Sequence, residues 1–193
     1  MGTAPQTILM VDDRPANLLA LERTLAPIDA ELVRAASGDE ALAAALDREF
    51  DLAILDVQMP GMDGYELAEL LRGDPRNRHT PIMFVTARSS TDEQVFRGYE
   101  SGAVDYLVKP YQPTVLVAKV RVLLEMQAQK KELARLRRRS DQLLRFTVEQ
   151  MPVPVIVAEA PDVAISMINR PALELLARPV GDTLTASLDD RRD

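Results

Sequence analysis

The chain of 193 residues contains no cysteine and a single histidine, His79. Without cysteine there can be no disulfide, thiolate nucleophile or sulfur-ligated metal, and one histidine cannot build a histidine-rich metal site. No apolar run approaches the roughly 18 residues needed to cross a bilayer. The first residues also lack the charged segment followed by an apolar segment that is typical of a signal peptide. We therefore expect a cytoplasmic protein that is not inserted in a membrane.

Basic residues are scarce in the first part of the chain. Residues 1–112 carry 10 basic and 19 acidic side chains, residues 113–151 carry 9 and 4, and residues 152–193 carry 4 and 7. An acidic first part argues against binding to a nucleic-acid backbone, which requires clustered Lys and Arg. The length allows one domain of typical size and a partial second one, and 47% apolar content is enough for a packed core.

Short apolar runs alternate with helical patterns along this acidic part. The central run is 51–56, which is followed by Pro-Gly and Asp-Gly turn signals and is typical of a short strand buried on both faces. Four more strands are predicted at 7–11, 31–35, 81–85 and 104–108, and helices at 15–26, 38–49, 65–72 and 91–101. Parallel neighbours need a crossover helix, so the alternation predicts an α/β fold with a doubly wound five-stranded parallel sheet.

Polar side chains follow four of these strands at their carboxyl ends, where open α/β sheets bind ligands. They are Asp12 and Asp13 after the first strand, Asp56 after the third, Thr86 after the fourth and Lys109 after the fifth. A lone acid at such a place is often only a turn cap, but here several polar groups gather at one edge.

The three acids together predict a cation site. Carboxylates about 6 Å apart repel by roughly 2.8 kcal/mol per pair at an effective dielectric constant of 20. Lys109 supplies one positive charge, and an all-oxygen site with room for water suits Mg²⁺, or Mn²⁺ in its place.

The motifs at these strand ends have a known counterpart. They are Met10-Val11-Asp12-Asp13, Ile54-Leu55-Asp56, Met59-Pro60-Gly61-Met62-Asp63-Gly64, Val85-Thr86-Ala87 and Val108-Lys109-Pro110. Because of these motifs, residues 7–124 resemble a response-regulator receiver domain of bacterial two-component signalling. The resemblance implies the flavodoxin-like strand order 2-1-3-4-5.

The resemblance also implies a role for each site residue. Asp56 would accept a phosphoryl group from a histidine kinase or a phosphotransfer protein, and Lys109 and Thr86 would meet the phosphoryl oxygens. Asp13, Asp56 and the backbone carbonyl of Gln58 would bind the metal directly, with Asp12 acting mainly through water. Such a domain catalyses its own phosphorylation and loses the phosphate slowly, and it is not a turnover enzyme.

Three further positions follow from the same resemblance. On phosphorylation Thr86 would move toward the phosphoryl group and Tyr106 would rotate inward, which changes the surface made by 91–101, 104–108 and the helix from 114. Gln58 and Arg88 would tune the phosphate lifetime. The bond from Lys109 to Pro110 would be cis, a property largely confined to proline.

A breaker-free helix is predicted from Thr114 to Met151, about 57 Å long. Its first turns, with Val115, Leu116, Val120 and Leu123, should cover the sheet. Beyond them a pattern of alternating three- and four-residue spacing favours a dimeric coiled coil with a weak seam, and the alternative is a solitary solvated helix. The seam residues are Val122, Met126, Gln129, Leu133, Leu136, Ser140, Leu143 and Thr147. The basic run 135–139 fits a solvated flank better than a nucleic-acid contact.

The remaining residues predict two short strands at 155–158 and 164–168 and then a helix from Asn169. This resembles the opening of a PAS sensor domain, and it is a small, partial α+β segment. The predicted organisation is therefore a receiver domain at 1–124, a coiled-coil signalling helix at 125–151 and a truncated PAS-like segment at 152–193. We expect this to be the front of a larger regulator whose output lies outside these residues.

Two other functions remain open at this point. One is a constitutive dimerisation scaffold that is not phosphorylated. The other is a haloacid-dehalogenase-type phosphatase, which also uses Asp, Thr, Lys and Mg²⁺ but has its nucleophile in an Asp-x-Asp pattern that the first strand lacks.

Overall fold

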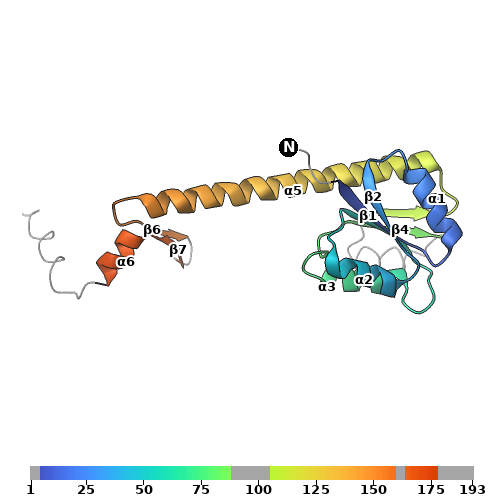
Figure 1. Ribbon diagram of the computed structural model, residues 1–193, viewed down its shortest axis with the longest axis horizontal. Coiled ribbons are helices and arrows are strands. Elements are labelled where there is room, and N and C mark those ends of the chain that lie inside the picture. The colour runs from blue at the N-terminus through green and yellow to red at the C-terminus, as the bar shows by residue number, and fades with distance from the viewer. Residues whose placement is uncertain (1–4, 88–104, 160–163, 178–193) are drawn as a thin grey trace, which may run out of the picture. The chain divides into compact units, whose positions relative to one another are not determined.

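The computed structural model describes residues 5–87, 105–159 and 164–177 (Figure 1). The chain divides into two compact units, Met1–Lys131 and Glu132–Asp193, which are described separately below. Within the described residues, no helix combines the length and the apolar character required to cross a lipid bilayer.

The first unit is built on a parallel sheet in the order β2-β1-β3-β4-β5 (Figure 1). This confirms the predicted fold class and strand order. The middle strand β3 is buried at every residue, as its unbroken apolar run predicted for a strand covered on both faces. The strands are β1 Gln6–Val11, β2 Ala30–Ala35, β3 Leu52–Asp56, β4 Ile82–Thr86 and β5 Asp105–Val108.

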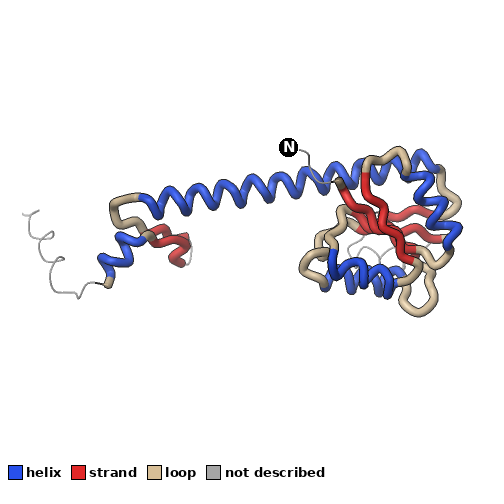
Figure 2. Tube along the Cα trace, in the orientation of Figure 1, coloured by secondary structure: helices blue, strands red, loops and turns tan. Residues whose placement is uncertain are grey.

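Helices cover both faces of this sheet (Figure 2). One core contains apolar residues of α1 (Pro15–Leu25) and α5 (Pro113–Gln150). The other contains residues of α2 (Gly38–Asp47) and α3 (Gly64–Gly73). The helix predicted at 91–101 lies outside the described residues.

The turn between β3 and α3 has strict local requirements. Asp63 caps α3 in a capping box with Glu66, which satisfies backbone N–H groups in the first turn. A Cβ atom on Gly64 would lie 2.3 Å from the carbonyl oxygen of Asp56, so only glycine fits there. Gly61 has a φ of +79°, a conformation that favours glycine. These residues fix the path of the chain directly after Asp56.

Helix α5 packs on the sheet with the stripe of Leu116, Val120 and Leu124, which are at most 3% exposed. Val115 was predicted on this face but is 39% exposed, because the four-residue spacing of the stripe turns Val115 to its edge. Leu123 packs only at the border of the same core.

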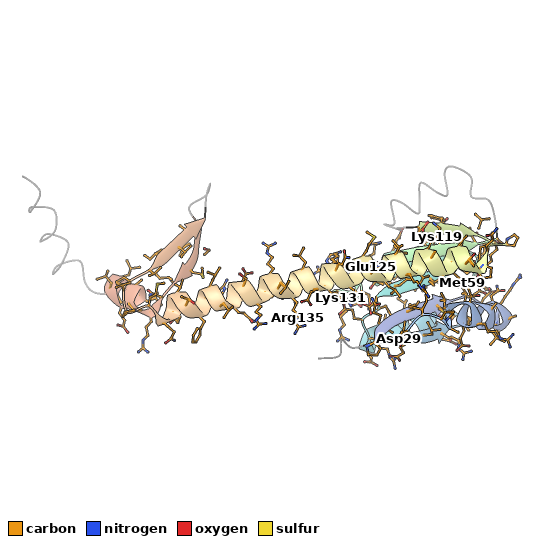
Figure 3. The ribbon with its side chains drawn as sticks, turned by 90° about the horizontal axis from the view of Figure 1, so that it is seen from above. Asp29, Met59, Lys119, Glu125, Lys131 and Arg135 are labelled. Atoms are coloured by element: carbon orange, nitrogen blue, oxygen red, sulfur yellow. The ribbon has the colours of Figure 1, made fainter. Side chains whose placement is uncertain are left out.

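Contacts of α5 with its own sheet continue past residue 124. Gln6 donates a side-chain hydrogen bond to the carbonyl oxygen of Leu124 (2.9 Å). Lys131 pairs with Asp51 at 2.8 Å and with Glu49 at 2.9 Å. Figure 3 shows Lys131 on α5 beside the sheet and Arg135 one turn further along. The first unit therefore extends to Lys131.

The second unit contains β6 (Ile156–Glu159) and β7 (Ala164–Ile168), an antiparallel pair, followed by α6 (Arg170–Leu176). Its centre is the fully buried Asn169. The Asn169 amide donates to the carbonyl oxygens of Val148, Met151 and Val153, and its oxygen accepts from the N–H groups of Val155 and Ala172. One side chain thus joins the end of α5, the start of β6 and the first turn of α6.

Candidate phosphoryl and metal site

Three carboxylates meet at the carboxyl edge of the sheet. Asp12 and Asp13 directly follow β1, and Asp56 ends the neighbouring strand β3. One carboxylate oxygen from each lies within 4.8 Å of the others. Asp12 is 1% exposed and Asp56 is 7% exposed. The predicted acidic cluster is therefore assembled at this edge, and most of it is buried.

Lys109 brings a positive charge to two of these acids from the end of β5. Its Nζ lies 2.8 Å from Oδ2 of Asp12 and 3.3 Å from Oδ2 of Asp56. Burial alone lowers the pKa of Lys109, but the bonds and charges of Asp12 and Asp56 outweigh it and raise the pKa above 10.5. The Lys109–Pro110 bond is cis, the conformation that the resemblance implied, and the Lys109 N–H donates to the carbonyl oxygen of Thr86 (2.7 Å).

Asp12 is held by more groups than the sequence suggested. The amide of Asn17 donates to both of its carboxylate oxygens at 2.9 and 3.0 Å, and the Arg14 N–H donates at 2.9 Å. With Lys109 this gives four hydrogen bonds to one buried carboxylate. Asn17 was not predicted as a site residue; an amide in the first turn of the helix after an acidic pair is the signal that could have identified it.

Asp56 has fewer hydrogen-bond donors around it than Asp12 has. Its Oδ1 is buried and, within the part of the chain that the structure describes, has no hydrogen-bond partner. Burial raises the pKa of the Asp56 carboxyl above its ordinary value of 3.8; Lys109 partly offsets this effect, and the Asp12 charge adds to it. A buried oxygen without a donor, beside two more carboxylates, fits a hard cation such as Mg²⁺, which takes oxygen ligands. The residues present therefore fit this metal.

A hollow of about 520 Å³ opens beside the cluster. Asp13 and Gln58 line it, together with residues that follow β3 and begin α3. Gln58 is exposed, so its side chain is accessible from this hollow. Arg88, predicted to act with Gln58 on phosphate lifetime, lies outside the described residues.

The two predicted switch residues occupy neighbouring strands. Thr86 ends β4, is 4% exposed and lies opposite Val108 in the strand register. Tyr106 in β5 is half-buried, with its ring centroid 5.1 Å from that of Phe84. Phe84 also contacts Tyr65 at 4.8 Å, so an aromatic row crosses the sheet from α3 to β5.

Tyr111 is a second neighbour of the site that the sequence did not indicate. It follows the cis peptide by one residue and packs at the border of the α1–α5 core. Burial raises the pKa of its phenol, the charge of Lys109 opposes this, and Asp12 and Asp56 add to it. The charges of the cluster thus act on the Tyr111 phenol, which is two residues from Lys109 in the chain.

Comparison with known proteins agrees with this geometry. The family model "Response regulator receiver domain" matches residues 8–121, more than half of the chain. The chain belongs to the response regulator receiver family. Receiver domains are phosphoryl acceptors and bind Mg²⁺ at an acidic pocket, and the family implies a histidine kinase or phosphotransfer protein as partner.

Relatives share the receiver but extend well beyond it. Response regulator PleD of Caulobacter vibrioides is 42% identical over 116 residues, which are 60% of this chain and 25% of that protein. Transcriptional regulatory protein PrrA of Mycobacterium tuberculosis is 40% identical over 123 residues, 64% of this chain and 52% of that protein. The chain thus spans about a quarter to a half of these curated relatives.

A solved structure supports the receiver fold directly. The Vibrio cholerae chemotaxis protein CheY4 superposes with a TM-score of 0.59 at 34% sequence identity. The match covers 62% of this chain and 99% of that one. The similarity is therefore that of a complete receiver domain within a longer chain.

Proposed function

We propose that this chain is the phospho-accepting receiver of a two-component phosphorelay, with Asp56 as the acceptor. The supporting observation is the buried Oδ1 of Asp56, which has no hydrogen-bond partner among the described residues, beside two acids and Lys109. An unpaired buried oxygen is costly unless a ligand satisfies it. This unsatisfied oxygen supports Asp56 as the residue that meets the phosphoryl group and the metal ion.

In the proposed reaction an Asp56 carboxylate oxygen attacks the phosphorus of a phosphohistidine on the partner. The phosphorus–nitrogen bond breaks as the new oxygen–phosphorus bond forms, and the imidazole leaves with the electron pair. Mg²⁺ or Mn²⁺, when bound, neutralises charge on the phosphoryl oxygens. Asp13, Asp56 and the Gln58 carbonyl would hold the ion. Asp12, which already accepts four hydrogen bonds, would act through water.

Lys109 and Thr86 would contact the phosphoryl group once it is attached to Asp56. The Lys109 ammonium is already within 3.3 Å of Asp56, so it needs little reorganisation to pair with the added charge. Thr86 would approach the phosphoryl group from the end of β4, and Tyr106 would turn further inward on Phe84. This change would alter the surface of β5 and α5 together with the helix predicted at 91–101.

The signal would leave through the long helix, which we propose forms a homodimer that controls a downstream output. The predicted seam residue Leu133 is 70% exposed and Leu143 is 59% exposed, so neither is used for internal packing. The segment from residue 152 would be the start of a PAS-like domain.

The direct test is phosphorylation of the full chain. With Mg²⁺ and phosphoramidate, a small phosphodonor, intact-mass measurement should show the gain of one phosphoryl group that is lost in alkali, as an acyl phosphate is. Asp56→Asn should abolish the gain, and the exposed Asp29→Asn should keep it. Phosphorylation that survives in Asp56→Asn would overturn the assignment.

A second measurement separates the alternatives. Beryllofluoride with Mg²⁺ mimics the phosphoryl group, and it should change the dimer population or geometry measured by solution scattering. An unchanged dimer would favour the constitutive scaffold. Steady release of phosphate from small phosphoesters would instead favour a phosphatase.

A further inference from the structure

One face of α5 presents a row of exposed apolar side chains that is interrupted by Gln129 and Ser140. Val122 is 56% exposed, Met126 61%, Leu133 70%, Leu136 53% and Leu143 59%. They recur at spacings of three and four residues, or multiples of seven, which on one helix places them in a single stripe. In heptad notation Met126 and Leu133 are at position a, and the other three are at position d.

The contacts of α5 with the receiver lie on the opposite side of the helix. Leu124 packs in the core of the first unit, Gln127 is buried, and Lys131 pairs with Asp51 and Glu49. In the same heptad Leu124, Gln127 and Lys131 are at f, b and f, which point away from a and d. Val122 and Met126, the part of the stripe inside the first unit, are therefore left uncovered by it, so a partner helix could begin to pack at Val122 while the first turns of α5 stay on the sheet.

Charges on both sides of the stripe specify how a partner must lie. Glu125 and Glu132 are at position g, and Lys130 and Arg137 are at position e; all four are exposed. In a parallel, in-register pair each g residue faces the e residue five positions later on the other helix. This brings Glu125 to Lys130 and Glu132 to Arg137 of a second copy, on both sides of the seam. Among these four residues, an antiparallel pair would face Glu with Glu or base with base, which are like charges.

Gln129 adds a register signal. It is at position d, where an in-register pair places it against the same amide of the second copy and allows a hydrogen bond. A slip of one heptad would set it against Leu136 and leave its amide without a partner at the seam.

We propose that two copies of this chain form a parallel, in-register coiled coil along α5 that starts at Val122, inside the receiver unit, with Glu125–Lys130 and Glu132–Arg137 pairs between the copies. This deepens the dimer of the proposed function and rests on it. The charges favour a second copy of this chain as the partner, because the acidic flank of each helix would face the basic flank of the other.

Single cysteines test the geometry, since the chain has none of its own. Met126→Cys and Leu143→Cys should each form a disulfide between copies under mild oxidation, because two seam positions so far apart can both face themselves only in a parallel, in-register pair. Ala128→Cys and Arg138→Cys, at the exposed outward positions c and f, should not. An antiparallel pair can bring a residue against itself at its centre of symmetry alone, so it cannot link at both 126 and 143.

Charge reversal gives an independent measurement on the full chain. Glu125→Lys with Glu132→Lys should weaken dimerisation in sedimentation by about tenfold or more, since four attractive pairs become repulsive. Adding Lys130→Glu and Arg137→Glu should restore the affinity to within about threefold of the original.

The outcomes distinguish this inference from the dimer itself. A monomer at all concentrations, with and without beryllofluoride, would overturn both. Suppose that the chain has the mass of a dimer in solution but fails to crosslink at 126 or 143, or that the variant with all four charges reversed does not regain its affinity. Either result would overturn only the parallel seam.

Discussion

The receiver and the chain beyond Lys131 differ in how far their large apolar side chains are exposed to solvent. In the receiver, Leu55 and Phe84 are fully buried between strands and helices, whereas Leu133 is 70% exposed and Ile165 is 62% exposed. A unit that buries its own core can fold alone, but a surface with so many exposed large apolar residues marks a place for a partner. The site chemistry thus resides in a self-sufficient unit, and the remainder is suited to assembly.

The largest expected effect compares the same substitution on the two parts of α5. Leu116→Ala removes a fully buried side chain and should lower the free energy of unfolding by about 2–5 kcal/mol. Leu133→Ala should change it by less than about 0.5 kcal/mol in dilute, monomeric protein and should instead weaken dimerisation. Urea unfolding monitored by circular dichroism measures both. Equal losses would show that α5 is packed alike along its length.

The second prediction concerns the small unit alone. Asn169→Ala removes the side-chain partner of the Val155 N–H and of the carbonyl oxygens of Val148, Met151 and Val153, at a cost of about 2–3 kcal/mol. Hydrogen exchange should speed up at residues 148–177 and stay unchanged in the receiver strands. Ser166→Ala, which removes only a 3.4 Å bond, is the matched control. Faster exchange in β1 or β3 would contradict independent units.

The third prediction uses the raised pKa of Asp56. Because burial raises this pKa in the folded chain, the ionised carboxylate costs stability as pH rises above 3.8 and through the raised value. Without divalent cations, Asp56→Asn should therefore be more stable than the parent at pH 7, and the difference should vanish below the ordinary pKa.

Added Mg²⁺ should stabilise the parent protein and have little effect on Asp56→Asn, since the variant lacks one of the three acids. Thermal unfolding with and without the metal measures this, with Asp29→Asn as the control. A variant less stable than the parent at pH 7 would contradict the unfavourable burial of this charge.

The smallest effect tests where the receiver ends. Lys131→Ala loses ion pairs to Asp51 and Glu49 and should cost about 0.5–1 kcal/mol, because the amine is partly exposed; Arg135→Ala, one turn later, should cost less.

This contribution should also depend on pH. Burial alone lowers the pKa of Lys131, but the two carboxylates outweigh it and raise the pKa above 10.5. The Lys131 contribution should thus be complete below pH 10.5 and be lost as pH rises through the raised pKa. Equal costs for Lys131→Ala and Arg135→Ala at pH 7 would place the boundary before Lys131.

Much of the fold and the candidate site follows from local sequence. Unbroken apolar runs such as 52–55 are typical of strands covered on both faces, and their alternation with helices leads to a parallel sheet. Once neighbouring strands are parallel, Asp12 and Asp56 must meet at one edge. Asn17 and Tyr111 could not be placed in this way, because their proximity to the acids depends on how α1 and the turn after Pro110 pack.

Sequence by itself thus determined the parallel sheet, the acidic cluster and the length of α5, since these depend on hydrophobic period and chain direction. Tertiary structure alone decided which carboxylate is saturated and which is left with an unpaired oxygen among the described residues. It also decided that Val115 is exposed and that the receiver holds α5 as far as Lys131. Contacts between residues far apart in the chain depend on side-chain packing in three dimensions, which a one-dimensional pattern does not encode.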